Sequence, residues 1–300
     1  VGEMSSTTLE NSIRYSNPES NELSMIFSFH HLKVDYPSGN KWEIEPFRFH
    51  DLKKHLFTWQ EEMEKGGGWN ALFWCNHDQP RIVSRIGNEK EYRVKSAKCL
   101  ATAIHGLKGT PYIYQGEEIG MTNAGYTSID EYMDIESLNY YNILKLQGKS
   151  EEEVIRILGA KSRDNSRTPM QWDASENAGF TKGTPWLKVC DRYKEINTES
   201  RHEPDSVFQY YKELVKLRKE LPVIQKGSVT PLLREDKEIL AYKREYQGKE
   251  LYVFCNFFDG EVKVPYSIPE DCRSILSNYG EEISPKELVL RPYEAVMFLR

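Results

Sequence analysis

Apolar and polar positions alternate over the first 120 residues of the chain with two different periods. Short apolar runs such as LSMIFSFH are typical of buried strands, and stretches with apolar residues every three or four positions are typical of amphipathic helices. The pattern predicts strands at 23–30, 70–78 and 111–120, and helices at 47–65 and 91–107. Strands that alternate with helices favour βαβ units on a parallel sheet, so we expect an α/β fold here.

The pattern changes twice in the rest of the chain. Residues 121–205 form a long stretch rich in polar residues, and an insertion of this length in an α/β domain is expected to be functional. A helix is predicted at 207–221, and after Pro222 the apolar positions alternate with a period of two. We therefore predict two domains, residues 1–221 with the insertion and an antiparallel β-sandwich at 222–300.

Composition restricts the partners. Hydrophobic residues make up 39% and charged residues 29% of the 300 positions, which is typical of a globular protein. The formal net charge of -6 argues against a nucleic-acid partner, because such a partner needs a basic surface. We expect no nucleic-acid and no membrane partner, and a small-molecule ligand instead.

Five cysteines are present and no two form a Cys-x-x-Cys pair. An odd number without close pairs favours reduced thiols over a disulfide framework or a zinc site. This usage predicts a cytoplasmic protein. No apolar run approaches the roughly 18 residues that span a bilayer.

Polar residues follow the predicted buried strands. The run ALFWC leads directly into Asn76, His77 and Asp78, and Glu3 lies at the end of the first strand-like segment. Side chains at the carboxyl ends of parallel strands face one crevice. Several carboxylates there suit cleavage of a glycosidic bond, in which one acid protonates the leaving oxygen and another anion lies near the sugar ring.

The strand predicted at 111–120 ends in Gln115, Glu117 and Glu118. For the two glutamates, capping of a helix or pairing with a cation is as good an explanation as catalysis.

Three longer motifs resemble a known family. GWNALFWCNHDQPRIVSR, GTPYIYQGEEIGMTN and KSRDNSRTPMQWDASENAGF are similar to the α-glucosidase branch of the α-amylase superfamily, glycoside hydrolase family 13. The resemblance covers essentially the whole chain. Within the branch, VGEMSST and ELSMIFSFHHLKVDYP are most similar to the trehalose-6-phosphate hydrolases, with oligo-1,6-glucosidases and dextran glucosidases as near relatives.

The resemblance implies a fold and a set of roles. Residues 1–221 would be the second half of a TIM (β/α)8 barrel, strands 5–8, and the β domain would follow it. Glu3 would be the general acid/base, Asp78 the carboxylate that stabilises the transition state, and His77 a ligand of the same sugar. Arg163 would bind the non-reducing-end glucose, whereas Arg167 is expected to be structural.

The sequence departs from the family in one respect. The family's nucleophile is an aspartate on the fourth strand, before the acid/base, and nothing precedes Val1 here. The tripeptide at 234–236 has the Arg-x-Asp pattern of the nucleophile segment, but it lies in the predicted β domain and not in the barrel. The resemblance therefore implies a retaining glycosidase of which this chain is a part, and we expect the isolated chain to be inactive.

A phosphorylated sugar needs cationic partners. The segment HHLKVDYPSGNKW places Lys33, His31 and Lys41 after the predicted strand 23–30, and these three are the candidate ligands of a 6-phosphate. An ordinary solvated loop is the alternative. The substrate is therefore expected to be trehalose 6-phosphate, with isomaltose-type sugars as the second possibility.

No cofactor and no metal site is expected within this chain. A structural calcium or magnesium ion, as in some family members, would lie in the half of the barrel that the chain lacks. The full-length enzyme is expected to be monomeric. A non-catalytic relative, similar to the heavy chains of amino-acid transporters, is a third reading, but such relatives lack the catalytic carboxylates, and Glu3 and Asp78 are retained.

Overall fold

The computed structural model describes residues 1–300, and its first part contains four short parallel strands. Their bounds are β1 Gly2–Glu3, β2 Ile26–Phe27, β3 Ala71–Leu72 and β4 Thr110–Pro111. The strand β1 pairs with β2 in parallel, β3 pairs with β4 in parallel, and a parallel bridge between Ile26 and Asn70 joins the two pairs. The predicted parallel pairing is present, but the hydrogen-bonded parts are much shorter than the apolar runs.

Helices separate these strands. They are α1 Leu9–Ser16, α2 Phe49–Lys65, α3 Ile82–Arg85 and α4 Arg93–His105. Gly66 directly follows α2, and its N–H bonds to the carbonyl of Glu62, as the three glycines predicted. The short helix α1 had no counterpart in the apolar pattern. Thr8 caps it by accepting a hydrogen bond from the backbone N–H of Asn11.

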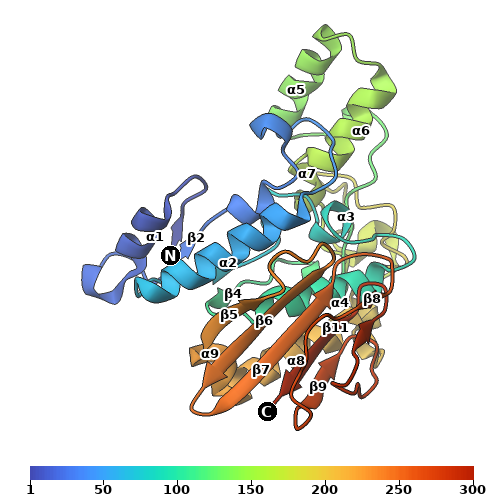
Figure 1. The fold of residues 1–300 in the computed structure, drawn as a ribbon. Coiled ribbons are helices and arrows are strands. Elements are labelled where there is room, and N and C mark those ends of the chain that lie inside the picture. Colours follow the sequence, from blue (N-terminus) through green and yellow to red (C-terminus); the bar gives the residue numbers. More distant parts are fainter.

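The segment 121–205 is largely structured rather than a plain loop. Its helices are α5 Ile135–Leu146, α6 Glu151–Lys161 and α7 Asp164–Arg167. The helices α5 and α6 form a hairpin that projects away from the C-terminal sheet (Figure 1). Asp134 and Ser150 cap the two helices with side-chain oxygens, so the polar residues of this segment include start signals for helices.

The C-terminal part is an antiparallel sheet. After α8 Val207–Glu220 and α9 Pro222–Lys226, the strand order is β5-β6-β7-β11-β9, and a separate pair, β8 with β10, accompanies it. The bounds are β5 Ser228–Leu232, β6 Ile239–Tyr246, β7 Lys249–Asn256, β8 Val262–Lys263, β9 Arg273–Ser277, β10 Val289–Leu290 and β11 Ala295–Leu299. Gln247 and Gly248, both with positive φ, form the tight turn predicted between β6 and β7.

Both faces of this sheet are buried. One face, with Tyr242 and Val253, belongs to the main core of 38 buried residues, which also includes α4 and α8. The other face, with Phe254 and Phe298, packs in a smaller core with residues around β8 and β10. The main core therefore runs continuously across residue 222.

Two further features concern the whole chain. All five cysteines are free and buried. None of the helices has both the length and the apolar character that crossing a bilayer requires.

Candidate functional site

Glu3 is an exposed carboxylate at the end of β1. It pairs across the ladder with Phe27 of β2 and lines a cavity of about 220 Å³. The lining is mainly aromatic, with Phe27, Phe73 and Tyr112 in edge-to-face contact, and it also includes His77. The ends of β1 and β3 therefore bring Glu3 and His77, which are distant in sequence, to one cavity.

Asp78 lies in a tight loop after β3. The Asn76 side-chain oxygen accepts a hydrogen bond from the backbone N–H of Asp78 at 2.8 Å, which is an Asx turn. The Sγ atom of the buried Cys75 accepts one from the N–H of Ile82 at 3.3 Å. The apolar run thus anchors the loop in the core, and the polar residues after it turn outward.

His77 and Asp78 are neighbours in space as well as in sequence. His77 Nε2 lies 3.4 Å from Asp78 Oδ2, and the His77 carbonyl accepts a hydrogen bond from Arg167 Nε at 2.8 Å. His77 is exposed and Asp78 is half-buried. Both side chains are therefore accessible to a ligand while the backbone between them is held.

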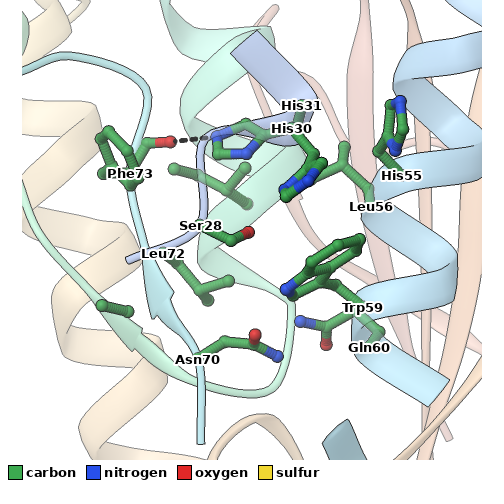
Figure 2. Close-up of a pocket in the computed structure, with 12 residues that line it drawn as sticks. Ser28, His30, His31, His55, Leu56, Trp59, Gln60, Asn70, Leu72 and Phe73 are labelled. Atoms are coloured by element: carbon green, nitrogen blue, oxygen red, sulfur yellow. Dashed lines mark hydrogen bonds between the residues drawn. The ribbon is translucent and has the colours of Figure 1, made fainter. Parts of the chain in front are cut away.

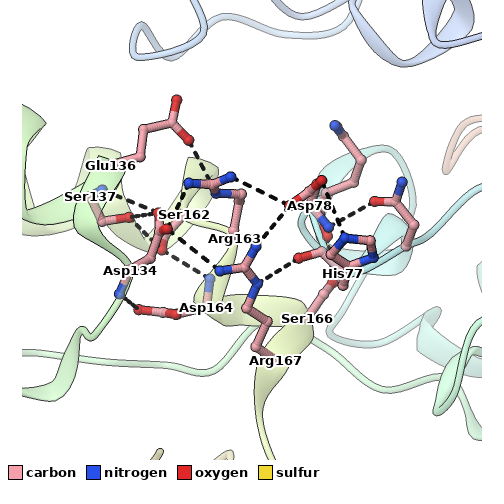
Figure 3. A network of polar contacts seen from close by, with 12 residues as sticks. His77, Asp78, Asp134, Glu136, Ser137, Ser162, Arg163, Asp164, Ser166 and Arg167 are labelled. Carbon is pink, nitrogen blue, oxygen red and sulfur yellow. Dashed lines mark hydrogen bonds and ion pairs between the residues drawn. The ribbon is translucent and has the colours of Figure 1, made fainter. Parts of the chain in front are cut away.

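Two guanidinium groups face Asp78 (Figure 3). Arg167 Nη2 lies 2.7 Å and Arg163 Nη1 3.5 Å from Asp78 Oδ1. The two arginines are four positions apart at α7, so they lie on one face of that turn. The structure brings Arg163 to Asp78, and it places Arg167, expected to be structural, even closer.

The hairpin α5–α6 contributes two further carboxylates. Asp134 Oδ1 accepts a hydrogen bond from Arg163 Nη2 at 2.8 Å, and Glu136 Oε2 lies 3.3 Å from Arg163 Nε. Burial alone would raise the pKa of the Asp134 carboxyl, but the hydrogen bond and charge of Arg163 outweigh burial and lower it. The prediction missed both residues. The only sequence signal was the capping pattern Asp-x-x-Ser at 134–137 within a segment already expected to be functional.

The two lysines of the predicted phosphate group lie in different surroundings. Lys33 Nζ donates hydrogen bonds to the carbonyl of Ser5 at 2.9 Å and to the hydroxyl of Ser6 at 3.3 Å, and it forms no ion pair with a carboxylate. Lys41 Nζ is paired with Glu136 at 2.8 Å. Lys33 therefore lies beside the segment that follows Glu3, whereas the charge of Lys41 is already compensated.

His31 is buried and lies between the strands and α2 (Figure 2). Its Nε2 is 2.8 Å from the carbonyl of Phe73, so this nitrogen carries the proton. Burial lowers the pKa of the imidazole to about 4, which leaves it neutral near pH 7. The other nitrogen is then only an acceptor and cannot bind a phosphate oxygen, so we do not retain His31 as a phosphate ligand.

Glu117 and Glu118 belong to the segment after β4. Glu117 is 3% exposed, and the hydroxyl of Tyr211 on α8 donates to it at 2.8 Å. Burial raises the pKa of Glu117 to about 7. Glu117 therefore contacts the helical layer rather than the cavity of Glu3, and its partner is a tyrosine hydroxyl, neither the helix cap nor the cation that the sequence suggested.

No three His, Cys, Asp or Glu side chains are grouped in a way that could hold a metal ion. The polar groups of the site are acids, guanidiniums and an imidazole. Such a set can bind sugar hydroxyls and transfer protons.

Comparison with known proteins gives one family. The family model described as "Alpha amylase, catalytic domain" matches residues 1–227. The chain is 51% identical to the trehalose-6-phosphate hydrolase of Bacillus subtilis strain 168, over 99% of this chain and 54% of that protein. It is 48% identical to the oligo-1,6-glucosidase of Halalkalibacterium halodurans, over 100% of this chain and 54% of that protein.

A solved structure is similarly close. The crystal structure of Bacillus licheniformis trehalose-6-phosphate hydrolase superimposes with a TM-score of 0.96 at 55% identity, covering 99% of this chain and 55% of that chain. The chain thus spans about half the length of the relatives it matches.

Proposed function

Because the chain belongs to the alpha-amylase family, we propose that it supplies the acid/base side of a retaining α-glucosidase that acts on trehalose 6-phosphate. In this proposal Glu3 protonates the leaving oxygen, and Asp78 with His77 binds the hydroxyls of the glucose whose bond breaks. Arg163 and Arg167 contact Asp78 and orient its side chain against that sugar. The fold would be the second half of a (β/α)8 barrel followed by the β domain.

A retaining mechanism also needs a nucleophilic carboxylate about 5–5.5 Å from the acid/base. We assign that role to no residue of this chain and propose that it lies in the part of the family's length that the chain does not span. Asp236, the aspartate of the Arg-x-Asp pattern at 234–236, accepts hydrogen bonds from the N–H groups of Glu238 and Ile239 in the loop before β6.

The position of Lys33 supports the phosphorylated substrate. The group that leaves on the Glu3 side would be glucose 6-phosphate, since Glu3 protonates its oxygen. The Lys33 ammonium lies at the Ser5 carbonyl, two residues beyond Glu3, and no carboxylate neutralises it. An ammonium group without a carboxylate partner can bind a phosphate dianion there.

The experiment compares two substrates in the full-length gene product. Lys33→Ala is expected to raise KM for trehalose 6-phosphate roughly tenfold or more, since a charged hydrogen bond is worth about 1.5–3 kcal/mol. KM for a nitrophenyl α-glucoside, which lacks phosphate, should stay the same. Lys54→Ala, at an exposed position of α2, is the matched control.

Equal changes for the two substrates would remove the phosphate assignment. The second candidate is an oligo-1,6-glucosidase, and the pairing of Lys41 with Glu136 favours it, because compensated charge suits a neutral sugar. Faster hydrolysis of isomaltose than of trehalose 6-phosphate by the unmodified enzyme would select it. We further propose that the enzyme is cytoplasmic, in keeping with its five free thiols.

A further inference from the structure

Four charged groups at the end of the α5–α6 hairpin form a closed ring (Figure 3). Asp78 and Asp134 each use Oδ1 to contact both Arg163 and Arg167. Asp78 is 2.7 Å from Arg167 and 3.5 Å from Arg163. Asp134 shows the reverse, 2.8 Å from Arg163 and 3.5 Å from Arg167.

The reciprocal distances mean that two carboxylates share two cations. Two positive and two negative charges leave the ring neutral, and each carboxylate has one close arginine. The Asp134 side chain is only 2% exposed, while that of Asp78 is 28% exposed. The Asp134 carboxylate is therefore enclosed by protein, whereas the Asp78 carboxylate faces the solvent, where a sugar would bind.

Asp134 is itself held firmly. Its backbone N–H and that of Met133 donate to Asp164 Oδ2, both at 2.8 Å. Its Oδ2 accepts from the backbone N–H of Ser137 at 3.2 Å and from the hydroxyl of Ser137 at 3.1 Å. The carboxylate is thus fixed by the start of α5 and by α7, so it can fix the arginines in turn.

We infer that Asp134 is a positioning residue, which shares Arg163 and Arg167 with Asp78 and so determines how much of Asp78 remains available to a sugar. Without the negative charge of Asp134, both guanidiniums would be drawn onto Asp78 and would occupy the oxygens that bind sugar hydroxyls. This inference rests on the proposed function only for the role of Asp78, and not for the ring itself.

The first test needs no activity. In the 15N-labelled 300-residue chain, Arg163→Lys and Arg167→Lys identify the two arginine Nε–H NMR signals. Asp134→Asn keeps the shape and the capping ability of residue 134 but removes its charge, and it is expected to shift both signals. Glu136→Gln should shift the Arg163 signal alone, because Glu136 contacts only that arginine of the pair.

Ser150→Ala is the control, because it removes a cap of the same kind at the start of α6, where Ser150 contacts no member of the ring, and it should leave both signals in place. If Asp134→Asn shifts the Arg163 signal alone or neither signal, the shared ring is wrong. This result would leave the proposed glucosidase function untouched.

The second test measures catalysis in the full-length gene product. Asp134→Asn should reduce kcat/KM about 10²-fold, the order expected when a catalytic group is displaced by about 1 Å. The reduction should be equal for trehalose 6-phosphate and for a nitrophenyl α-glucoside, since the ring lies on the side of the glucose they share. Unchanged kcat/KM on any hydrolysed α-glucoside would overturn the positioning role, and an unmodified enzyme that hydrolyses no α-glucoside would instead overturn the proposed function.

Discussion

The strands of the two halves of the chain differ in length and in surroundings. The parallel strands β1 to β4 contain two residues each, whereas β6 and β7 contain eight each. After β3, three buried apolar residues lead into the polar residues Asn76, His77 and Asp78, while β7 is almost entirely buried, with relative exposures of 0–3% from Leu251 to Cys255. The short strands thus support loops that carry chemistry, and the long ones supply packing.

The difference also appears in how charges are placed. Around Asp78 the charged side chains are half-exposed and contact one another. In the C-terminal sheet the buried Arg244 has no carboxylate partner and donates instead to the carbonyls of Ser228, Gly227 and Gly106. Charge in the first region can meet a ligand, and charge in the second joins the sheet to α4.

The largest expected effect is a loss of stability from disrupted packing in the C-terminal sheet. Phe254 on β7 is completely buried in the smaller core, so Phe254→Ala should lower the free energy of unfolding by about 3–5 kcal/mol. Thermal unfolding of the 300-residue chain, followed by circular dichroism, measures it. A loss below about 1 kcal/mol would mean that this sheet does not carry the stability we assign to it.

Asp78→Asn should reduce activity strongly and stability little, in contrast to Phe254→Ala. We expect kcat/KM of the full-length gene product to fall about 10²–10³-fold, equivalent to about 2.7–4 kcal/mol, as for removal of one preorganised electrostatic group. The unfolding free energy of the 300-residue chain should change by less than about 1 kcal/mol, because the Asp78 pairs are half-exposed. Asp259→Asn, at an exposed position after β7 that forms no ion pair, is the control. Destabilisation as large as that of Phe254→Ala would remove the contrast between the two regions.

The smallest expected effect concerns pH and His31. Its pKa of about 4 lies below the ordinary value of 6.5, so the unfolded chain binds more protons than the folded one between these values. The contribution of the buried neutral His31 to the free energy of unfolding is therefore complete above pH 6.5. It is lost as pH falls towards 4, and the loss amounts to about 3 kcal/mol.

His31→Gln keeps a donor for the Phe73 carbonyl and does not titrate. The variant should lose less unfolding free energy than the unmodified chain between pH 6.5 and 4, as measured by urea denaturation at each pH. His202→Gln, at an exposed position, should change nothing. Identical acid profiles of the unmodified chain and His31→Gln would show that His31 is not buried as a neutral ring.

Part of the site was predictable from local pattern. The run that ends at Cys75 is apolar because it is buried, and the polar residues after it turn outward, so the place of His77 and Asp78 was predictable. Lys33 stays a prediction of the same kind, made from a cation that follows a strand. Arg167 was set aside because nothing in its local sequence distinguishes a guanidinium that holds a loop from one that faces a carboxylate.

The amino-acid sequence alone determined the alternation of strands and helices from residue 23 to residue 111, the end of α2 at a glycine, the helix α8 and the group of strand-end acids, because these follow from periodicity and from backbone preferences of single residues. Only the tertiary structure decided which charges share a partner. It placed Asp134 between two arginines, paired Lys41 with Glu136, and turned His31 into the core. The physical reason is that ion pairs and burial depend on distances between segments far apart in the chain, and local pattern carries no information about those distances.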